Sequence, residues 1–99
     1  MGVKKHHHPG KILQRDFMRR QHLSANALAR ALHVPPNRIT GIINGERAVS
    51  ADTAIRLAYY FDTFPEDWMT WQAAYDLDQV RKQHGERIKT EVRRRRGSP

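Results

Sequence analysis

Residues that start helices recur along the whole chain and divide it into five short segments. Pro9, Pro36 and Pro65 suit the first turn of a helix, where the missing N–H would have no partner in any case. Ser24 and Ser50 can each cap a helix with a hydroxyl oxygen. Behind each of these residues, apolar side chains return every three or four positions, as on one face of a helix. No segment alternates like a half-buried strand, so the sequence predicts an all-α chain of five helices.

The predicted ends of these helices follow from residues that stop a helix. A residue before proline avoids the helical conformation, so the second helix should end ahead of Pro35 and Pro36. Asn44 and Gly45 should end the third helix, because glycine takes the left-handed conformation that a helix end requires. Gly85 should end the fifth helix in the same way. The predicted ranges are about 9–21, 25–32, 36–44, a fourth helix that Ser50 caps, and 65–84.

Size and charge limit the classes of protein to which the chain can belong. It has 99 residues, no cysteine and a formal net charge of +8. This length suits one small domain, and the missing cysteines exclude disulfides and thiolate zinc sites. There is no run of membrane-spanning length and no secretory signal pattern, so we expect a cytoplasmic protein. The basic charge favours a nucleic-acid partner over a merely solvated surface.

The segment 24–45 has the pattern of a helix-turn-helix. In this motif a first helix crosses the DNA backbone, and a second enters the major groove by its N-terminal end. Ala29 is small enough for a close helix crossing, Val34 can plug the turn, and Ile39 and Ile42 can hold the second helix to the body. This spacing favours DNA binding over an ordinary helical hairpin. We therefore expect a flexible basic arm (1–8), a helix-turn-helix domain (9–84) and a basic C-terminal tail (85–99).

Four positions of the predicted second helix should face the groove. Asn37 can pair with two atoms of adenine, Arg38 can pair with two atoms of guanine, and the Thr40 methyl group can contact thymine. Gly41 is small enough to face a base but offers no side-chain hydrogen bond. Because few side chains read bases, much of the affinity should come from phosphate contacts. The residues expected at phosphates are Ser24, Asn44, Arg47 and Ser50.

Three stretches of the sequence resemble a known family. LSANALARALHVPPNRITGIINGERAVSADTAIRLAYYFDT resembles the lambda-repressor-like (Xre-type) helix-turn-helix. The flanking HHHPGKIL and FPEDWMTWQAAYDL are similar to the HPGEIL start and SPEFWLNLQAAYDL end of the HigA/VapI plasmid-maintenance antitoxins. The resemblance covers roughly residues 7–78, and paired flanking motifs of this kind are specific.

The resemblance implies a lambda-repressor-like domain, partners and a mode of action. It implies a homodimer that binds a palindromic operator in double-stranded DNA and represses its own operon. It also implies that the chain silences a HigB-type toxin, a ribosome-dependent mRNA endonuclease of RelE-like fold. The chain departs from the family pattern at Ala25, where glutamine is usual, and at Trp71, where leucine is common. Phe64 replaces the usual serine, so the cap of the fifth helix must come from Thr63 or be absent.

Three aromatic residues lie three and four positions apart in the predicted fifth helix. Trp68, Trp71 and Tyr75 could stack on RNA bases, but this spacing is more typical of a core or an interface. We expect them at a dimer contact, with dimerisation through the C-terminal helix. Two copies joined in this way would place their reading helices about 34 Å apart, one turn of DNA.

Three charged or polar segments remain with less definite roles. His6, His7 and His8 lie on an arm without fixed geometry, so we expect no metal site there. The acidic stretch 61–80 is either a solvated face or a docking surface for a basic partner or the basic tail. Arg93–Arg96 is either a phosphate anchor or a solubilising tail, and the second interpretation is slightly favoured.

These observations predict a DNA-binding antitoxin and no enzyme. The sequence has no nucleophile elbow, no glycine-rich phosphate loop and no cluster with metal-ligand spacing, so neither catalysis nor a cofactor is expected. Two alternatives stay open. One is a repressor without a toxin, and the other is a protein-interaction module with little DNA binding, which Ala25, Pro36 and Gly41 would favour.

Overall fold

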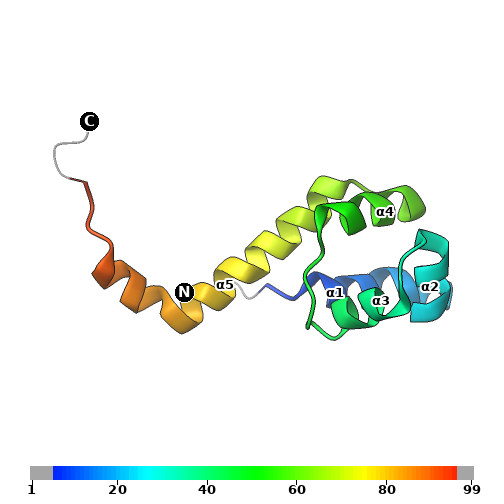
Figure 1. The fold of residues 1–99 in the computed structure, drawn as a ribbon, viewed down its shortest axis with the longest axis horizontal. Helices are drawn as coiled ribbons and strands as arrows, with labels where there is room; N and C mark the ends of the chain where they lie inside the picture. Colours follow the sequence, from blue (N-terminus) through cyan, green and yellow to red (C-terminus); the bar gives the residue numbers. More distant parts are fainter. Residues whose placement is uncertain (1–5, 96–99) are drawn as a thin grey trace.

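The computed structural model describes residues 6–95, and this part of the chain is helical without strands (Figure 1). A continuous helical run comprises α1 (Pro9–Ile12), the π-helical segment η1 (Leu13–Met18) and the 3-10 turn η2 (Arg19–Gln21). The remaining helices are α2 (Ala25–Leu32), α3 (Pro36–Ile43), α4 (Ala51–Phe61) and α5 (Pro65–Glu91). The predicted all-α class, the five helical segments and all five predicted starts are confirmed.

Two serine hydroxyls cap the helices as the sequence predicts. The Ser24 hydroxyl oxygen accepts the backbone N–H of Ala27 at 3.1 Å, at the start of α2. The Ser50 hydroxyl oxygen accepts the backbone N–H of Thr53 at 3.3 Å, at the start of α4. Each bond satisfies one of the N–H groups that a helix start leaves without an internal partner.

The first turn of α5 has no side-chain cap. Phe64 occupies the cap position, and its side chain has no oxygen to offer. The hydroxyl of Thr63, one residue earlier, instead accepts the indole N–H of Trp68 at 2.9 Å. The sequence allowed either a cap from Thr63 or no cap. The helix has no cap, because the Thr63 hydroxyl is used by the buried indole nitrogen of Trp68.

The core forms where α1, η1, α2, α3, α4 and the first half of α5 meet. Helices α1 and α3 are in very close contact at Gly10. A Cβ atom there would lie 1.7 Å from the carbonyl oxygen of Ile42, so only glycine allows this approach. The largest fully buried aliphatic side chains are Leu13, Leu28, Ile39, Ile42, Val49 and Leu57.

The prediction that Trp68 lies at a dimer contact is wrong. Its side chain is completely buried inside one chain, packed against the rings of Phe17 and Trp71 at centroid distances of 5.2 and 5.0 Å. Trp71 and Tyr75 are partly buried in the same chain, where Tyr75 meets the ring of His8 edge-on. A domain this small needs its large aromatic residues for its own core, and this need explains the difference.

The predicted end of α5 at Gly85 is also wrong, because the helix continues to Glu91. An interior glycine costs a helix only about 1 kcal/mol relative to alanine. Just beyond Gly85, Arg87 pairs with Glu91 one turn further along the helix at 3.9 Å. Figure 1 shows α5 running past α4 and then leaving the body. The predicted boundary between domain and tail therefore falls inside a helix.

The segment just before α1 is packed, although it was predicted to be a flexible arm. The backbone N–H of His6 donates to the Asp78 carboxylate at 2.9 Å, which ties this segment to α5. The ring of His8 caps α1, since its Nδ1 accepts the N–H of Gly10 at 2.9 Å. Residues 1–5 of the predicted arm and residues 96–99 of the predicted tail lie outside the described part.

The helices that the structure describes include none that is long and apolar enough to cross a membrane.

Candidate nucleic-acid interface

The turn between α2 and α3 fixes how the second helix of the motif is presented. His33 takes a left-handed conformation with φ 58°, which ends α2. The N–H of Val34 then bonds to the Ala29 carbonyl at 3.0 Å, and the Val34 side chain is buried. Pro35 is extended and leads directly into α3. The turn is thus closed by backbone bonds and an apolar plug, as a helix-turn-helix requires.

Two of the predicted base-reading residues, Asn37 and Thr40, lie on the side of α3 away from the core. Ile39 and Ile42 are completely buried, while Asn37 and Thr40 are exposed. The Thr40 hydroxyl lies within bonding distance of carbonyl oxygens in its own helix, 3.4 Å from that of Pro36 and 3.3 Å from that of Asn37. Its methyl group is therefore the part available to a ligand. The Arg38 side chain is 31% exposed and turns toward α4.

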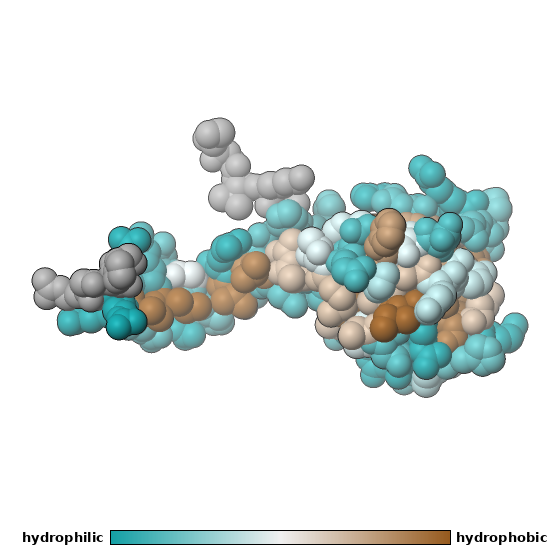
Figure 2. Space-filling model, turned by 90° about the horizontal axis from the view of Figure 1, so that it is seen from above, coloured by the Kyte–Doolittle hydropathy of each residue, from teal (hydrophilic) through white to brown (hydrophobic). Residues whose placement is uncertain are grey.

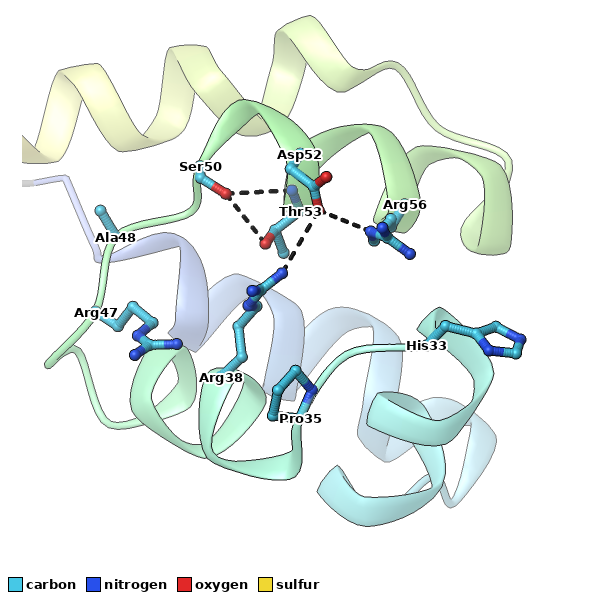
Figure 3. A pocket seen from close by; sticks show the side chains of 9 residues that line it. All are labelled: His33, Pro35, Arg38, Arg47, Ala48, Ser50, Asp52, Thr53 and Arg56. Carbon is cyan, nitrogen blue, oxygen red and sulfur yellow. Dashed lines mark hydrogen bonds and ion pairs between the residues drawn. The ribbon is translucent and has the colours of Figure 1, made fainter.

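A cleft of about 480 Å³ separates the start of α3 from the start of α4 (Figure 3). Arg38 and Pro35 line one side, and Ser50 and Arg56 line the other. Arg47 comes from the loop between the two helices. This arrangement places three guanidinium groups around the N-terminus of a helix, a combination that attracts anions.

The loop from Asn44 to Ser50 is folded back on α3. The backbone N–H groups of Glu46 and Arg47 both bond to the Gly41 carbonyl, at 2.9 and 3.1 Å. A Cβ atom at Gly41 would lie 3.2 Å from the Cβ atom of Arg47, a tight contact. Gly41 therefore gives space to the loop that carries Arg47, a role that the local sequence does not indicate. Its predicted place at a base stays a prediction.

The predicted phosphate-binding residues do not all meet in this cleft. Arg47 and Ser50 line it, but Ser24 lies in a separate hollow near Met18. Asn44 lines a third hollow, on the side of the N-terminal histidines. The Ser50 hydroxyl is engaged with Thr53, donating to its Oγ1 at 3.2 Å, so the backbone N–H groups of α4 are the better anion donors.

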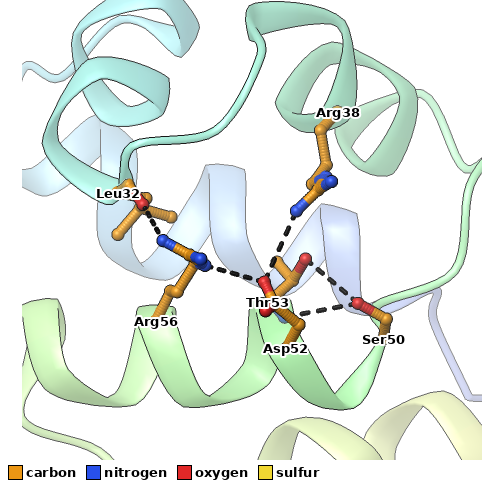
Figure 4. A network of polar contacts seen from close by, with 6 residues as sticks. All are labelled: Leu32, Arg38, Ser50, Asp52, Thr53 and Arg56. Atoms are coloured by element: carbon orange, nitrogen blue, oxygen red, sulfur yellow. Dashed lines mark hydrogen bonds and ion pairs between the residues drawn. The ribbon is translucent and has the colours of Figure 1, made fainter.

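A polar network connects the cleft to the framework (Figure 4). The Asp52 carboxylate accepts the Arg56 Nε–H at 2.7 Å and lies 3.5 Å from an Arg38 nitrogen. Arg56 also donates to the carbonyl of Leu32 at 2.8 Å, near the end of α2. The hydrogen bond from Arg56, together with the charges of Arg56 and Arg38, holds the pKa of Asp52 below its ordinary value. The carboxylate is therefore ionised whenever DNA would bind.

Sequence reasoning missed two residues that shape this interface. The four-residue spacing of Asp52 and Arg56 indicates a helical ion pair, but the bond from Arg56 to α2 has no sequence signal. Gln72 is buried in α5, and its side-chain oxygen accepts the N–H of Val49 at 2.9 Å. This bond fixes the end of the loop directly before α4, and nothing in the local sequence indicates it.

Comparison with known proteins assigns this architecture to a family. Residues 15–69 match the model of a helix-turn-helix family, HTH_3. The chain is 49% identical to virulence-associated protein I of Dichelobacter nodosus over 70 residues, which cover 71% of the chain. The match spans 65% of that relative, slightly less than two thirds of its length.

Two solved structures resemble the whole described fold. One is an addiction module antidote protein of the HigA family from Coxiella burnetii, with 43% identity and a TM-score of 0.87; the alignment covers 93% of this chain and 100% of that one. The other is the Pseudomonas aeruginosa antitoxin HigA with the higBA promoter, with 40% identity and a TM-score of 0.85, covering 88% and 95%. The chain belongs to the Xre-like helix-turn-helix family, HTH_3, and its structural neighbours are HigA-type antitoxins.

Proposed function

We propose that the chain is a sequence-specific DNA-binding antitoxin of the HigA type, which represses its own operon as a homodimer. The observation that carries this proposal is the cleft beside α3, where Arg38 and Arg47 meet the N-terminus of α4. A solved relative, 40% identical, is described as an antitoxin with its promoter, which supports DNA as the ligand of this face.

In this proposal α3 enters the major groove by its N-terminal end. Asn37 and Arg38 then meet base edges, and the Thr40 methyl group meets a thymine methyl group. Arg47 and the first N–H groups of α4 bind the phosphates beside the groove. Gln72 and Gly41 act indirectly, because they fix the loop that carries Arg47.

The second half of α5 is the surface that we assign to the homodimer, in place of Trp68. Leu77, Val80, Ile88 and Val92 are between 39% and 66% exposed. Leu77, Val80 and Ile88 lie at helical spacing on the part of α5 that leaves the body, and Val92 follows directly after its last residue. Figure 2 shows apolar residues along this extension. Pairing two such extensions would bury this stripe and arrange two α3 helices for a palindromic operator.

The proposal of a toxin partner is based on family membership. Antitoxins of the HigA type are named for a toxin partner, so we propose a HigB-type mRNA endonuclease of RelE-like fold as the protein that this chain silences. The complex would act in the cytoplasm, on the nucleoid when it is bound to its operator. A repressor without a toxin is the alternative, and the neighbouring reading frame distinguishes the two.

DNA binding is tested by the anisotropy of a labelled duplex from the region upstream of the gene. The double variant Asn37→Ala, Arg38→Ala should lower operator affinity by at least about tenfold, because each lost bidentate contact between a side chain and a base is worth about 1–3 kcal/mol. Lys82→Ala removes a cation from exposed α5 and is the matched control. Unchanged operator affinity in the double variant would exclude the assigned reading helix.

Dimerisation is tested by light scattering during size-exclusion chromatography. Leu77→Asp with Ile88→Asp should give a monomer, because two charges would be buried in the proposed contact. Gln83→Asp with Lys89→Asp places the same new groups on exposed positions of the same helix outside the stripe, and it should remain dimeric. A monomeric wild type would contradict the homodimer, although a single chain could still bind half of an operator.

The toxin is tested by co-expression with any small basic protein that a neighbouring reading frame encodes. Restored growth and co-purification of the two proteins support the antitoxin role. If that neighbour is absent while operator binding persists, the chain is a repressor without a toxin. If a toxin co-purifies while operator binding is absent, the chain is a protein-interaction module.

A further inference from the structure

Asp52 is an acid placed among the arginines of the proposed phosphate-binding cleft. A carboxylate in the first turn of a helix is ordinary, because it complements the helix dipole. Asp52 does more than this, since the same oxygen atom faces both Arg56, at 2.7 Å, and Arg38, at 3.5 Å (Figure 4). A negative charge at this place opposes the binding of any phosphate, so its presence requires an explanation.

The two arginines are held with different firmness. Arg56 is bonded at both ends of its guanidinium group, to Asp52 and to the Leu32 carbonyl, so it bridges α4 and α2. Arg38 has the single long contact with Asp52 and belongs to the reading helix. The Asp52–Arg56 pair therefore fixes the position of the carboxylate. The carboxylate in turn makes a weak contact with Arg38. An exposed ion pair at 3.5 Å is easily exchanged for a better partner.

We propose that Asp52 is a positioning residue that makes Arg38 selective between the operator and other DNA. On unrelated sequences Arg38 stays with Asp52, and the carboxylate discourages a phosphate from taking its place. On the operator a guanine edge offers Arg38 two acceptors, and this bidentate contact replaces the long pair. Asp52 thus penalises binding to unrelated DNA more than binding to the operator. This inference rests on the proposed DNA-binding function.

The variant Asp52→Asn tests this role with little change in shape. Asparagine still offers an oxygen to Arg56, while the charge that holds Arg38 and repels phosphate is removed. The affinity for a scrambled duplex should rise roughly three- to tenfold, because Arg38 gains a phosphate contact. The affinity for the operator should change less, so the ratio of the two affinities should fall. The salt slope on scrambled DNA should increase by about one for each protomer.

The matched control is Asp16→Asn, which changes the net charge equally. Asp16 also pairs with an arginine, Arg15 at 2.9 Å, but it lies in η1 and does not line the cleft. A general effect of charge would raise binding to scrambled DNA by the same factor in both variants. Only Asp52→Asn should lower the affinity ratio.

The Arg38→Ala background separates positioning from simple repulsion and from structural damage. Adding Asp52→Asn to Arg38→Ala should leave the affinity ratio as it is in Arg38→Ala alone. The inference is overturned if the ratio falls equally in that background, if it falls equally in Asp16→Asn, or if it is unchanged in Asp52→Asn. If the wild type itself shows no preference for the operator, the proposed function fails first and this inference fails with it.

Discussion

At the scale of single residues, local sequence chemistry explains the helix starts but not the contacts that join distant segments. The Ser24 and Ser50 caps could be predicted because a cap is made within four residues. Gly10 carried no such signal, because the reason for glycine there is the Ile42 carbonyl on another helix. The placement of Trp68 failed for the same reason, since spacing places a residue on a face but does not say what covers that face.

Gly10→Ala should strongly destabilise the domain. The added Cβ atom would meet a backbone oxygen at 1.7 Å, so α1 must move away from α3. We expect the free energy of unfolding in urea to fall by about 3 kcal/mol, the upper end of the usual range for overpacking. Gly85→Ala is the matched control, because the nearest atom to its added Cβ lies at 3.9 Å. That change should stabilise α5 by up to about 1 kcal/mol, and equal losses in both variants would refute the close crossing.

His8 should make stability depend on pH. Burial lowers its pKa below the ordinary value, and the Asp76 charge and a backbone hydrogen bond at Arg47 oppose this only in part. The neutral ring is favoured in the fold because its Nδ1 accepts the Gly10 N–H. This contribution is complete above the unfolded pKa of about 6.5 and is lost as the pH falls below that value.

The pH effect should amount to less than about 1 kcal/mol, because the ring is only partly buried. Urea unfolding at pH 7.5 and pH 5.5 measures it, in a range where carboxylates stay ionised. His8→Asn keeps an oxygen that can cap α1 but does not titrate, so this variant should lose less stability between the two pH values. An equal loss in both proteins would show that other groups cause the dependence.

At the scale of elements, the helix starts were easier to predict than the helix ends. All five starts were correct, because proline and serine act locally. The predicted end of α5 was wrong because a glycine such as Gly85 can either end a helix or lie inside one. Which of the two occurs depends on the neighbouring residues and on any helix that packs beside it. The extension that results carries the exposed stripe of Leu77 and Ile88.

Gly85→Pro should separate the domain from this extension. Proline removes the N–H and clashes with the preceding turn, at a cost of about 3 kcal/mol or more inside a helix. We expect lower helicity by circular dichroism and a monomer by light scattering, while residues 9–84 still unfold cooperatively. Gly85→Ala is the control, because alanine at the same position keeps the backbone N–H and its Cβ atom meets nothing closer than 3.9 Å, so this variant should stay helical and dimeric. A variant that stays dimeric would place the interface elsewhere.

At the scale of the whole molecule, the proposed reading face and the proposed dimer surface lie in different parts of an elongated chain. The described residues extend 54 Å along the longest axis and 26 and 25 Å along the others. Helices α1 to α4 form the body that carries the cleft, and α5 passes from that body to the extension (Figure 1). The sequence could predict the motif and its second helix, α3, because their residues lie within a short segment. It could not predict that Arg38 meets the Asp52–Arg56 pair, because α3 and α4 must be placed before they do.

The charge of this face should make operator binding depend steeply on salt. Each phosphate neutralised contributes about 0.9 to the slope of log affinity against log salt concentration. Arg47→Ala should therefore reduce that slope by about two for a dimer, because each copy loses one contact, and it should weaken binding to operator and scrambled DNA by similar factors. Lys82→Ala, on exposed α5, should leave the slope unchanged. Anisotropy titrations between 50 and 200 mM salt, at roughly five concentrations, would measure the slopes. A nearly flat dependence in the wild type would mean that base contacts alone hold the complex, which the few exposed side chains of α3 cannot readily supply.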